Sequence, residues 1–383
     1  MIANEKDTPH FELPPGCKLI IKDKEIHDLY VYVISVTVEA DRNKASTATI
    51  EFSDRIGPEQ NWIVQDDSRL SPGAAVKIVM TFDQRQLTLF TGYLVKMSSS
   101  FTDKNAKVTI ECQDETLKLD QNHKQIEYNA NISLADGEIV ANILKNYDIP
   151  SITTQPGLTA KSISQNGSDI QLINSRAKAN GFEFYIHNGA AYFGPMQLSG
   201  DPQAPDILIN CAAANCINFE VSNDVRNPIT VVYEITHPSE NGEKPIVSRE
   251  TLTSNLPLLG ATPARNEDSS LGESEWYLGK TKADDEELAR ASAKKKINEA
   301  SMRIKATGEL DGLLYNSILR TGRTVTVVGA GLINSGVYYV DSVSHKISSK
   351  GYYQKFKLLR NAISTTTTKA KTPGRTNAVY EDA

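Results

Sequence analysis

The residue types that carry enzyme chemistry occur in this chain, but not at the spacings that known reactive sites use. The sequence contains no G-x-S-x-G, no H-E-x-x-H, no phosphate-binding glycine loop and no EF-hand loop. The histidines are far apart and show no metal-ligand spacing: His10, His27, His123, His187, His237 and His345. We therefore predict that the chain is not an enzyme, that it has no catalytic, cofactor-binding or metal-binding residues, and that its histidines are solvated or hydrogen-bonded.

Two weaker chemical signals remain. Ser292 and Lys295 match the S-x-x-K of β-lactamases by letter, but the companion motifs are missing and the pair lies in a charged helical segment. The run Lys294–Lys296 is more typical of a solvated helix face than of a binding patch. Carboxylates are plentiful, and a glycosidase-like pair stays open because such pairs meet only in space.

Composition describes an ordinary globular protein. The chain has 383 residues, enough for two or three domains, with 39% hydrophobic and 23% charged residues. Its formal charge of -6 argues against sequence-specific or general nucleic-acid binding. The cysteines are scattered, as expected of buried residues in a reducing compartment: Cys17, Cys112, Cys211 and Cys216. No run is apolar enough for a membrane anchor, and the N-terminus is too polar for a signal peptide, so we expect synthesis in a cytoplasm.

A stretch near the N-terminus returns in shorter form near the C-terminus. Residues 73–114 and 322–360 both read as three strands, each with a glycine before the first strand and one in the second. From those glycines onward the alternation is shared, and it matches three residue pairs: Tyr93 with Tyr338, Val95 with Val340, and Met97 with Ser342. Any two antiparallel sheets share some of this pattern. The repeat nevertheless favours two related β domains in one chain.

The first domain is expected at 17–124, after an extended arm at 1–16. Strands are predicted at Lys18–Lys22, Leu29–Ala40 and Thr47–Ser53, and the second of these is rich in β-branched and aromatic residues, as in a central strand. A polar loop, Arg55–Leu70, then leads into the first repeat.

Residues 125–200 change to a helical period and form a predicted α+β insert. A capping box at Ser133–Asp136 starts one helix, and Ser168 with Gln171 starts a second, which ends at Asn180-Gly181. Asn188-Gly189 between two apolar runs predicts a hairpin with a type I′ turn. Because Pro202 and Pro205 follow, we expect this insert to project from the body of the protein.

The second β domain is expected at 201–362. It contains a long surface loop from His237 to about Gly272 and a helix at 284–305, whose stripe of small residues should lie close against a sheet. The remainder, 363–383, is low in complexity and predicted to be a flexible tail. Basic residues exceed acidic ones over the last forty residues, which suits either an acidic partner or solubility.

The order of these elements resembles the baseplate hubs of contractile phage tails, the late control D family, to which the N-terminal half of the VgrG spike is similar. The resemblance covers roughly residues 15–362. It rests on D-I-Q-L-I-N-S-R-A-K-A-N-G-F-E-F-Y-I-H-N-G-A-A-Y-F-G-P in the insert and on G-V-Y-Y-V-D-S-V-S-H-K at the end of the second β domain, and it is most specific at Ser168–Pro195, where a helix, Asn-Gly-Phe and an aromatic hairpin follow one another. It implies a mainly β (α+β) fold with two related tube-like β-barrel domains and a small α+β insert between them.

The resemblance also implies a function. We expect a structural baseplate hub of a contractile tail or injection particle, a homotrimer that adapts a sixfold tail tube to a threefold spike. Implied partners are the tail tube protein, other baseplate proteins and a spike that is a separate chain, since the sequence stops at Ala383 without a following OB-fold or β-helix. The alternative is a tail-tip hydrolase that degrades the cell wall, because such activities often travel with hubs of this family. The particle is a phage, a tailocin or an extracellular injection system.

Overall fold

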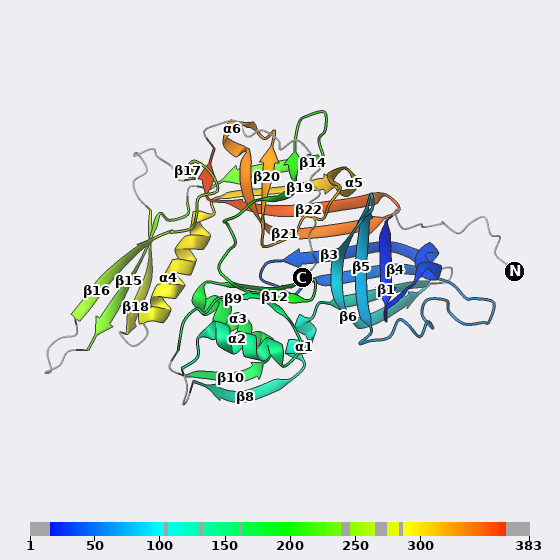
Figure 1. Ribbon diagram of the computed structural model, residues 1–383, viewed down its shortest axis with the longest axis horizontal. Coiled ribbons are helices and arrows are strands. Elements are labelled where there is room, and N and C mark those ends of the chain that lie inside the picture. The colour runs from blue at the N-terminus through cyan, green and yellow to red at the C-terminus, as the bar shows by residue number, and fades with distance from the viewer. Residues whose placement is uncertain are drawn as a thin grey trace.

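The computed structural model of the protein describes residues 16–102, 106–129, 133–160, 162–224, 226–238, 246–264, 274–282 and 286–364. The architecture is mainly β, as the sequence predicts (Figure 1). The predicted N-terminal arm, up to residue 15, and the predicted tail from residue 365 onward lie outside the described residues. The domain boundaries proposed from the sequence stay predictions.

The N-terminal part of the sheet is a five-strand unit, here called unit 1. Its strands are β3 (Val33–Asp41), β4 (Thr47–Asp54), β5 (Ala75–Phe82), β6 (Arg85–Phe101) and β7 (Ala106–Gln113). They lie side by side in the order β3-β4-β7-β6-β5, and β1 (Cys17–Ile21) and β2 (Lys24–Glu25) extend the sheet beyond β5. On β4 the alternate residues Ala48, Ile50 and Phe52 are buried in the core, which the period of two in the sequence predicts.

The C-terminal part is a second five-strand unit, called unit 2, with the same order of strands. It consists of β14 (Cys216–Asn223), β19 (Ile304–Asp311), β20 (Thr324–Val328), β21 (Gly336–Ser348) and β22 (Gly351–Arg360). The order β14-β19-β22-β21-β20 repeats that of unit 1, and β13 (Gln203–Leu208) extends it beyond β20. Its core is separate from that of unit 1 and includes Ile304, Leu310, Val340, Phe356 and Leu358.

The two units also share their register. In unit 1 the backbone of Leu94 exchanges hydrogen bonds with Gly73 and Ala74, and in unit 2 the backbone of Val340 does so with Gly322 and Arg323. Both glycines have positive φ. A β-bulge follows immediately in both, between Leu94 and Lys96 and between Val340 and Ser342.

This register corrects the equivalences taken from the sequence. Tyr93 pairs with Ala75 and Tyr339 pairs with Thr324, each one residue before the hydrogen-bonded Leu94 or Val340, so Tyr93 corresponds to Tyr339 and not to Tyr338. Gly92 and Gly336 are not equivalent. The sequence comparison aligned two glycines that serve different purposes: a Cβ on Gly92 would meet the Gln113 carbonyl, and one on Gly336 would meet Arg360.

The two units join directly into one sheet. Ser342–Ser348 of β21 pair antiparallel with Ser35–Asp41 of β3, a contact that we call the inner seam. The long run that contains β3 is therefore central, as predicted, although its start at His27–Tyr32 is a 3-10 helix (η1) and not a strand. Among the strands that the structure describes, no pair closes the sheet on itself, so the predicted barrels are open within one chain.

The insert lies beneath the sheet in Figure 1. Its elements are α1 (Thr116–Asp120), β8 (His123–Tyr128), α2 (Asp136–Lys145), β9 (Ser151–Thr154), β10 (Ile163–Ser168), α3 (Asp169–Asn180), β11 (Glu183–His187) and β12 (Ala190–Gly194). The start and end of α3 are as predicted: Ser168 is its N-cap, and Gly181 ends it in the left-handed conformation. The Asn188-Gly189 hairpin is also confirmed, with positive φ at both residues.

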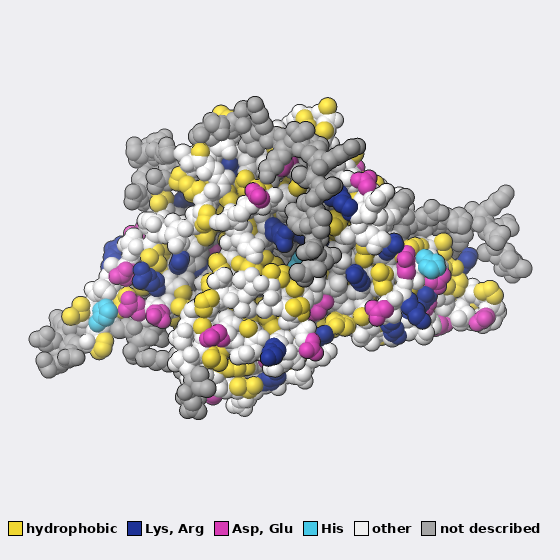
Figure 2. Space-filling view, viewed as in Figure 1, with side chains coloured by type: hydrophobic (Ala, Val, Ile, Leu, Met, Phe, Trp, Pro, Cys, Tyr) yellow, Lys and Arg dark blue, Asp and Glu magenta, His cyan; other side chains and the backbone are white. Residues whose placement is uncertain are grey.

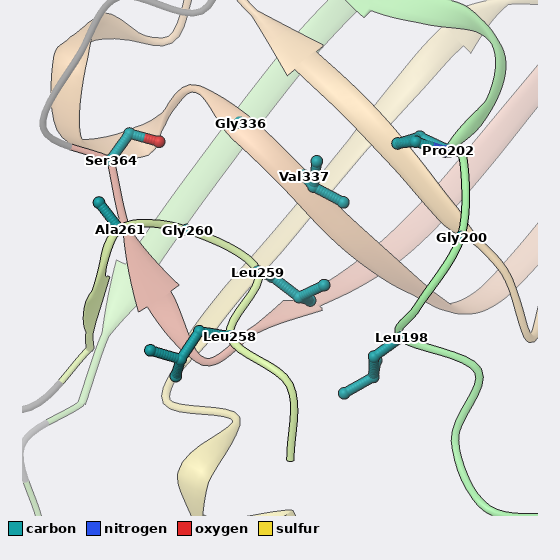
Figure 3. A pocket seen from close by; sticks show the side chains of 10 residues that line it. All are labelled: Leu198, Gly200, Pro202, Leu258, Leu259, Gly260, Ala261, Gly336, Val337 and Ser364. Atoms are coloured by element: carbon teal, nitrogen blue, oxygen red, sulfur yellow. The ribbon is translucent and has the colours of Figure 1, made fainter.

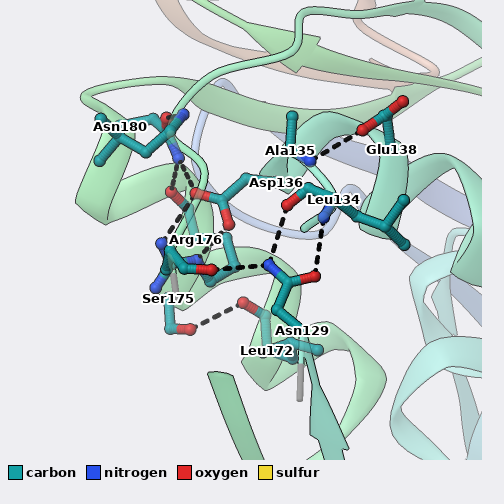
Figure 4. A network of polar contacts seen from close by, with 11 residues as sticks. Asn129, Leu134, Ala135, Asp136, Glu138, Leu172, Ser175, Arg176 and Asn180 are labelled. Carbon is teal, nitrogen blue, oxygen red and sulfur yellow. Dashed lines mark hydrogen bonds and ion pairs between the residues drawn. The ribbon is translucent and has the colours of Figure 1, made fainter. Parts of the chain in front are cut away.

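The first helix of the insert begins later than predicted. Ala135, not Ser133, is the N-cap of α2, and its backbone N–H donates to the Glu138 carboxylate at 2.8 Å. Asp136 is buried and binds α3, because the Arg176 guanidinium donates to both of its carboxylate oxygens at 2.7 and 2.8 Å and Asn180 Nδ2 donates at 2.6 Å (Figure 4). Asp136 therefore links α2 to α3, a contact that the predicted capping box at Ser133–Asp136 does not indicate.

Between β14 and β19 the chain forms a protruding arm (Figure 1). It contains β15 (Thr230–His237), β16 (Ile246–Thr253), β18 (Glu275–Lys282) and α4 (Glu286–Ser301), whereas β17 (Thr262–Pro263), in the same stretch of chain, lies against the body. The predicted surface loop after His237 is wrong in part, because β16 pairs with the whole length of β15. The predicted helix 284–305 ends early, at Ser301, since Ile304 already begins β19; it does pack on a sheet, through Ala293, Ile297 and Ala300.

Three short elements complete the described chain. They are α5 (Gly312–Tyr315), α6 (Gly331–Asn334) and β23 (Ala362–Ile363), which pairs with β17. The helix α5 occupies the connection of unit 2 that corresponds to the polar loop of unit 1 after β4. Asp311 caps it by accepting from the backbone N–H groups of Leu313 and Leu314.

Candidate functional site: the inner seam and the polar sheet face

The histidines are distributed over separate elements, and two of them approach the same arginine. His187 ends β11, His345 lies in the middle of β21, and both are near Arg320. His10 lies outside the described residues. Over the described ranges, no three His, Cys, Asp or Glu side chains come together in a way that could hold a metal ion.

The Arg320 cluster is largely covered by the protein: His345 is buried, and Arg320 and His187 are half-buried. A guanidinium nitrogen of Arg320 contacts Nε2 of His187, another donates to the Thr88 carbonyl at 3.3 Å, and Nδ1 of His345 lies 2.9 Å from the Tyr352 hydroxyl. Burial, reinforced by the charge of Arg320, lowers the pKa of His187 and of His345 to about 3. Both imidazoles are therefore neutral near pH 7. Sequence spacing gave no sign of this cluster, because its members come from distant elements.

A second buried network lies at the inner seam and joins three parts of the chain. Arg42, just after β3, donates from Nε to Asp341 Oδ1 at 2.6 Å and from Nη1 to Glu183 Oε1 at 2.5 Å. The Tyr339 hydroxyl donates to the other oxygen of Glu183. Burial raises the pKa of Glu183, while Arg42 opposes that shift. Unit 1, unit 2 and the insert are thus held by one set of ionic contacts.

This network corrects the expectation that the insert projects freely. The strand β11 places Glu183 and Tyr185 against the seam, and Tyr185 leaves no space for a side chain at Gly322 of unit 2. The insert consequently covers a junction between the two units, and its hairpin is part of the packed body.

Two carboxyl groups with raised pKa, those of Asp114 and Glu183, have structural contacts. Burial raises the pKa of Asp114 to about 6, although its oxygens accept from the backbone N–H groups of Ser46 and Thr116. Glu183 is satisfied by Arg42 and Tyr339. Neither carboxyl lines the groove or the pocket described next. A raised pKa here follows from burial and carries no sign of acid-base catalysis.

The outward face of the sheet is polar across both units. On β4 the residues between the buried ones are Thr47, Thr49 and Glu51, and on β22 they include Lys355 and Lys357. Cross-strand ion pairs run along this face: Lys107 Nζ donates to Glu51 at 2.6 Å, which lowers the pKa of Glu51, and Lys96 Nζ donates to Glu111 at 3.0 Å.

Part of this face is hollowed into a groove of about 790 Å³ that crosses β3, β14, β19, β21 and β22. Its charged lining residues are of both signs, four acidic and three basic: Glu39, Asp41, Glu220, Glu309, Lys44, Lys355 and Lys357. Charges of both signs are also interspersed over the face seen in Figure 2. Such a mixed surface offers hydration and weak contacts, with no large single-sign field to attract a charged ligand.

A smaller pocket of about 420 Å³ lies beside the end of unit 2 (Figure 3). Its wall is formed largely by glycine and apolar residues, among them Leu198, Leu259, Gly336 and Val337. Next to it the buried Arg360 donates to the carbonyls of Leu259, Ile333 and Ser335 and to the Ser364 hydroxyl, all uncharged acceptors. Arg360 organises these loops.

A family model described as the Alg8 N-terminal domain matches residues 15–349. The chain belongs to this family. The matched range includes unit 1, the insert, the arm and most of unit 2. No curated protein sequence matches the chain.

Solved structures with the same fold include tail proteins and a type VI secretion component. The 43 kDa tail protein of prophage MuSo2 from Shewanella oneidensis has a TM-score of 0.67 at 12% identity, with 90% of this chain and 98% of that chain covered. A tail protein from Neisseria meningitidis has a TM-score of 0.63 at 12% identity, with 90% and 96% covered. A component of the E. coli type VI secretion system has a TM-score of 0.51 at 11% identity, with 89% and 76% covered.

These likenesses establish the fold. The Alg8 N-terminal domain family therefore includes a chain with the fold of phage tail proteins, and the same fold occurs in a type VI secretion component. Among the helices of the described ranges, none is sufficiently long and apolar to cross a membrane.

Proposed function

We propose that this protein is a structural hub in a phage tail or contractile injection particle. In this proposal three copies form a ring between a sixfold tail tube and a threefold spike carried by a separate chain. The protein is made in a bacterial cytoplasm and becomes part of the assembled particle. The assignment to the late control D hubs belongs to this proposal and rests on the sequence resemblance described above.

The duplicated five-strand unit carries the proposal. Both units have the same strand order, the same glycine before β5 or β20 and the same bulge in the strand that follows. Three copies would present six such units to a sixfold tube, while the arm occurs only between β14 and β19 and so would repeat three times. A ring of head-to-tail contacts is a normal closed solution for a homo-oligomer.

The polar sheet face supports the same role. A wall of Ser, Thr, Lys and Glu side chains with balanced charge suits a passage through which cargo moves without binding tightly. The buried ionic contacts at the inner seam hold the two units in a fixed relation, which a load-bearing ring needs.

Light scattering of the purified chain, alone and mixed with its spike, tests the proposal. We expect a hub-spike complex with three copies of each. A stable hub dimer, or a true hub hexamer, would exclude the symmetry adaptor. A zymogram on purified cell walls belongs beside this measurement, because clearing that a single carboxylate substitution abolishes would replace the structural role by the hydrolase alternative.

A further inference from the structure

The inner seam joins one strand of unit 2 to one strand of unit 1. The strand that corresponds to each of them in the other unit has an edge that the described strands leave unpaired. In unit 2, residues 342–348 of β21 pair with β3 on the side away from β22. The corresponding part of unit 1, Lys96–Phe101 of β6, pairs with β7 on one side, and the described strands provide no partner on the other. In the same way β14, the counterpart of β3, pairs only with β19 and ends the sheet.

The register defines which residues correspond. Leu94 pairs with Cys112 and Val340 pairs with Leu358, so Cys112 corresponds to Leu358. Their partners on the next strand are Ala48 and Ala306, which therefore correspond. On the strand after that, Val38 corresponds to Val221 in the same way. Ser342 likewise corresponds to Lys96. Every strand of the inner seam thus has a defined counterpart at one of the two open edges.

We propose that Lys96–Phe101 of one copy pair antiparallel with Phe219–Asp224 of a second copy, in the register of the inner seam. Because Ser342 lies opposite Asp41 and Ile347 opposite Val36 within the chain, Lys96 lies opposite Asp224, Ser98 opposite Ser222 and Phe101 opposite Phe219 between chains. We call this contact the outer seam. It deepens the proposed function, since a ring of copies needs such a contact, but it does not itself fix the number of copies.

The side chains at the two edges suit each other. Phe101 is 56% exposed, whereas its counterpart Ile347 at the inner seam is fully buried. A large apolar side chain is therefore exposed to solvent at the position where the inner seam buries one. On the polar face Lys96 meets Asp224, a pair of opposite charges, and Ser100 meets Glu220. No like charges lie opposite one another in this register.

Open edges of this length need an explanation. An unpaired row of N–H and C=O groups invites pairing with another chain, and proteins usually block it with proline, a bulge or a covering segment. Neither Lys96–Phe101 nor Phe219–Asp224 contains a proline. A second copy satisfies both edges at once, because each copy carries both halves of the contact.

Cysteine cross-linking tests the outer seam. Exposed Cys211 and half-exposed Cys216 are first changed to serine, and Ser98→Cys and Ser222→Cys are combined in one chain. Oxidation should then link copies to one another on a non-reducing gel. The matched control is Ser344→Cys with Glu39→Cys at the inner seam, where the Ser344 hydroxyl donates to the Glu39 carboxylate at 2.6 Å and a bond should form within one chain.

A register control distinguishes pairing from chance contact. Ser98→Cys combined with Asn223→Cys shifts one partner by a single residue and turns it to the other face of the strand, so cross-linking should fall at least tenfold. Circular dichroism of each variant shows that the fold is retained. If the inner-seam control forms its bond but Ser98→Cys and Ser222→Cys give no link at any protein concentration, the outer seam is wrong.

The outcomes separate the seam from the proposed function. Covalent trimers as the largest product support both. Cross-linked products that continue past three copies, or that close at another number, support the seam and overturn the trimer. A trimer by light scattering whose copies do not cross-link at these positions keeps the hub and overturns the seam.

Discussion

Units 1 and 2 share a strand order and a register but differ in the connection between their first two strands. In unit 1, Asp41 leads to Thr47 through a short turn. In unit 2 the same step, from Asn223 to Ile304, contains the whole arm. The register is constrained because a shift by one residue would expose every core side chain, whereas a longer connection adds little entropic cost. The sheet is the part that a duplicated chain must keep, and the connections are the part that it can vary.

A second difference lies at the edges of the equivalent strands β3 and β14. The edge of β3 is covered by β21 and locked by Arg42, Asp341 and Glu183. The edge of β14 ends the sheet, and the nearby Arg226 forms an exposed ion pair with Asp224. The arginine that follows β3, Arg42, is therefore largely buried, and the one that follows β14, Arg226, is exposed. The contribution of burial to the stability of an ion pair can thus be measured within one chain.

The largest effect is expected from Arg42→Ala. It leaves Glu183, 3% exposed, without its charge partner, and breaking a buried pair in this way costs about 3–5 kcal/mol of unfolding free energy. Arg226→Ala is the matched control and should leave stability unchanged, since its side chain is 87% exposed. Chemical denaturation compares the two. Equal losses would mean that the inner seam is not held by its ionic contacts.

The pH dependence of stability should come from His187 and His345, the two histidines near Arg320. Their pKa values of about 3 lie below the unfolded value of about 6.5, so the unfolded chain binds more protons and stability is lost as pH falls from about 6.5 toward 3. The slope is about 1.4 kcal/mol per pH unit for each histidine. Asp114, with its pKa raised to about 6, acts in the opposite sense between about pH 4 and 6.

Substitution assigns that slope. His345→Gln should flatten the loss of stability between pH 6 and 4, measured by urea denaturation at each pH, relative to the exposed-site control His123→Gln. An unchanged slope in His345→Gln would show that other groups control the acid response.

The two equivalent glycines provide a smaller contrast. Gly73→Ala and Gly322→Ala both place a Cβ at positive φ, which costs about 1–2 kcal/mol. Around Gly73 the space is open, but at Gly322 the new Cβ would lie 2.6 Å from the Tyr185 hydroxyl oxygen, adding about 1–3 kcal/mol of overpacking. Thermal or chemical unfolding should rank Gly322→Ala as clearly the less stable variant. The reverse order would contradict the packing of the insert against unit 2.

The smallest effect on stability is expected from Lys96→Ser, which places the residue of unit 2, Ser342, in unit 1. The ion pair with Glu111 is exposed, so its loss should cost less than about 1 kcal/mol. If the outer seam forms, the same change removes the charge opposite Asp224 and should weaken self-association in light scattering. A matched exposed change away from the seam, Lys77→Ser on β5, should leave association unaltered.

Periodicity was sufficient to predict much of this fold. The alternation of β4, the caps of α3 and the Asn188-Gly189 turn are local signals, and the structure confirms all three. The three-strand pattern that occurs in both units is also a local signal. The sequence equivalences were wrong by one residue because the pairing that fixes them, of Tyr93 with Ala75 and of Tyr339 with Thr324, involves hydrogen bonds between strands that a single sequence does not display.

Contacts between distant residues account for the rest. Glu183 reads as part of an ordinary strand, and nothing near it in sequence indicates that it meets Arg42 and Tyr339 at the inner seam. The strand β16 was missed because its alternate residues are polar, although Asn241-Gly242 and Pro245 precede it in the sequence; its pairing with β15 defines it. The helix α4 was extended too far because Ile304 continues the apolar spacing of the helix while belonging to β19.

The bulge that both units share also bears on shape. A bulge bends its strand and increases the local twist, and here it falls where β6 stops pairing with β5 and β21 stops pairing with β20, while each strand continues beside β7 or β22. A wall built from six such units must turn by about 60° at each one to meet itself. In the proposed ring, the extra residue in each strand, Val95 in unit 1 and Asp341 in unit 2, would mark a corner of the wall, and the radius of the passage would be set there and not by the length of any strand.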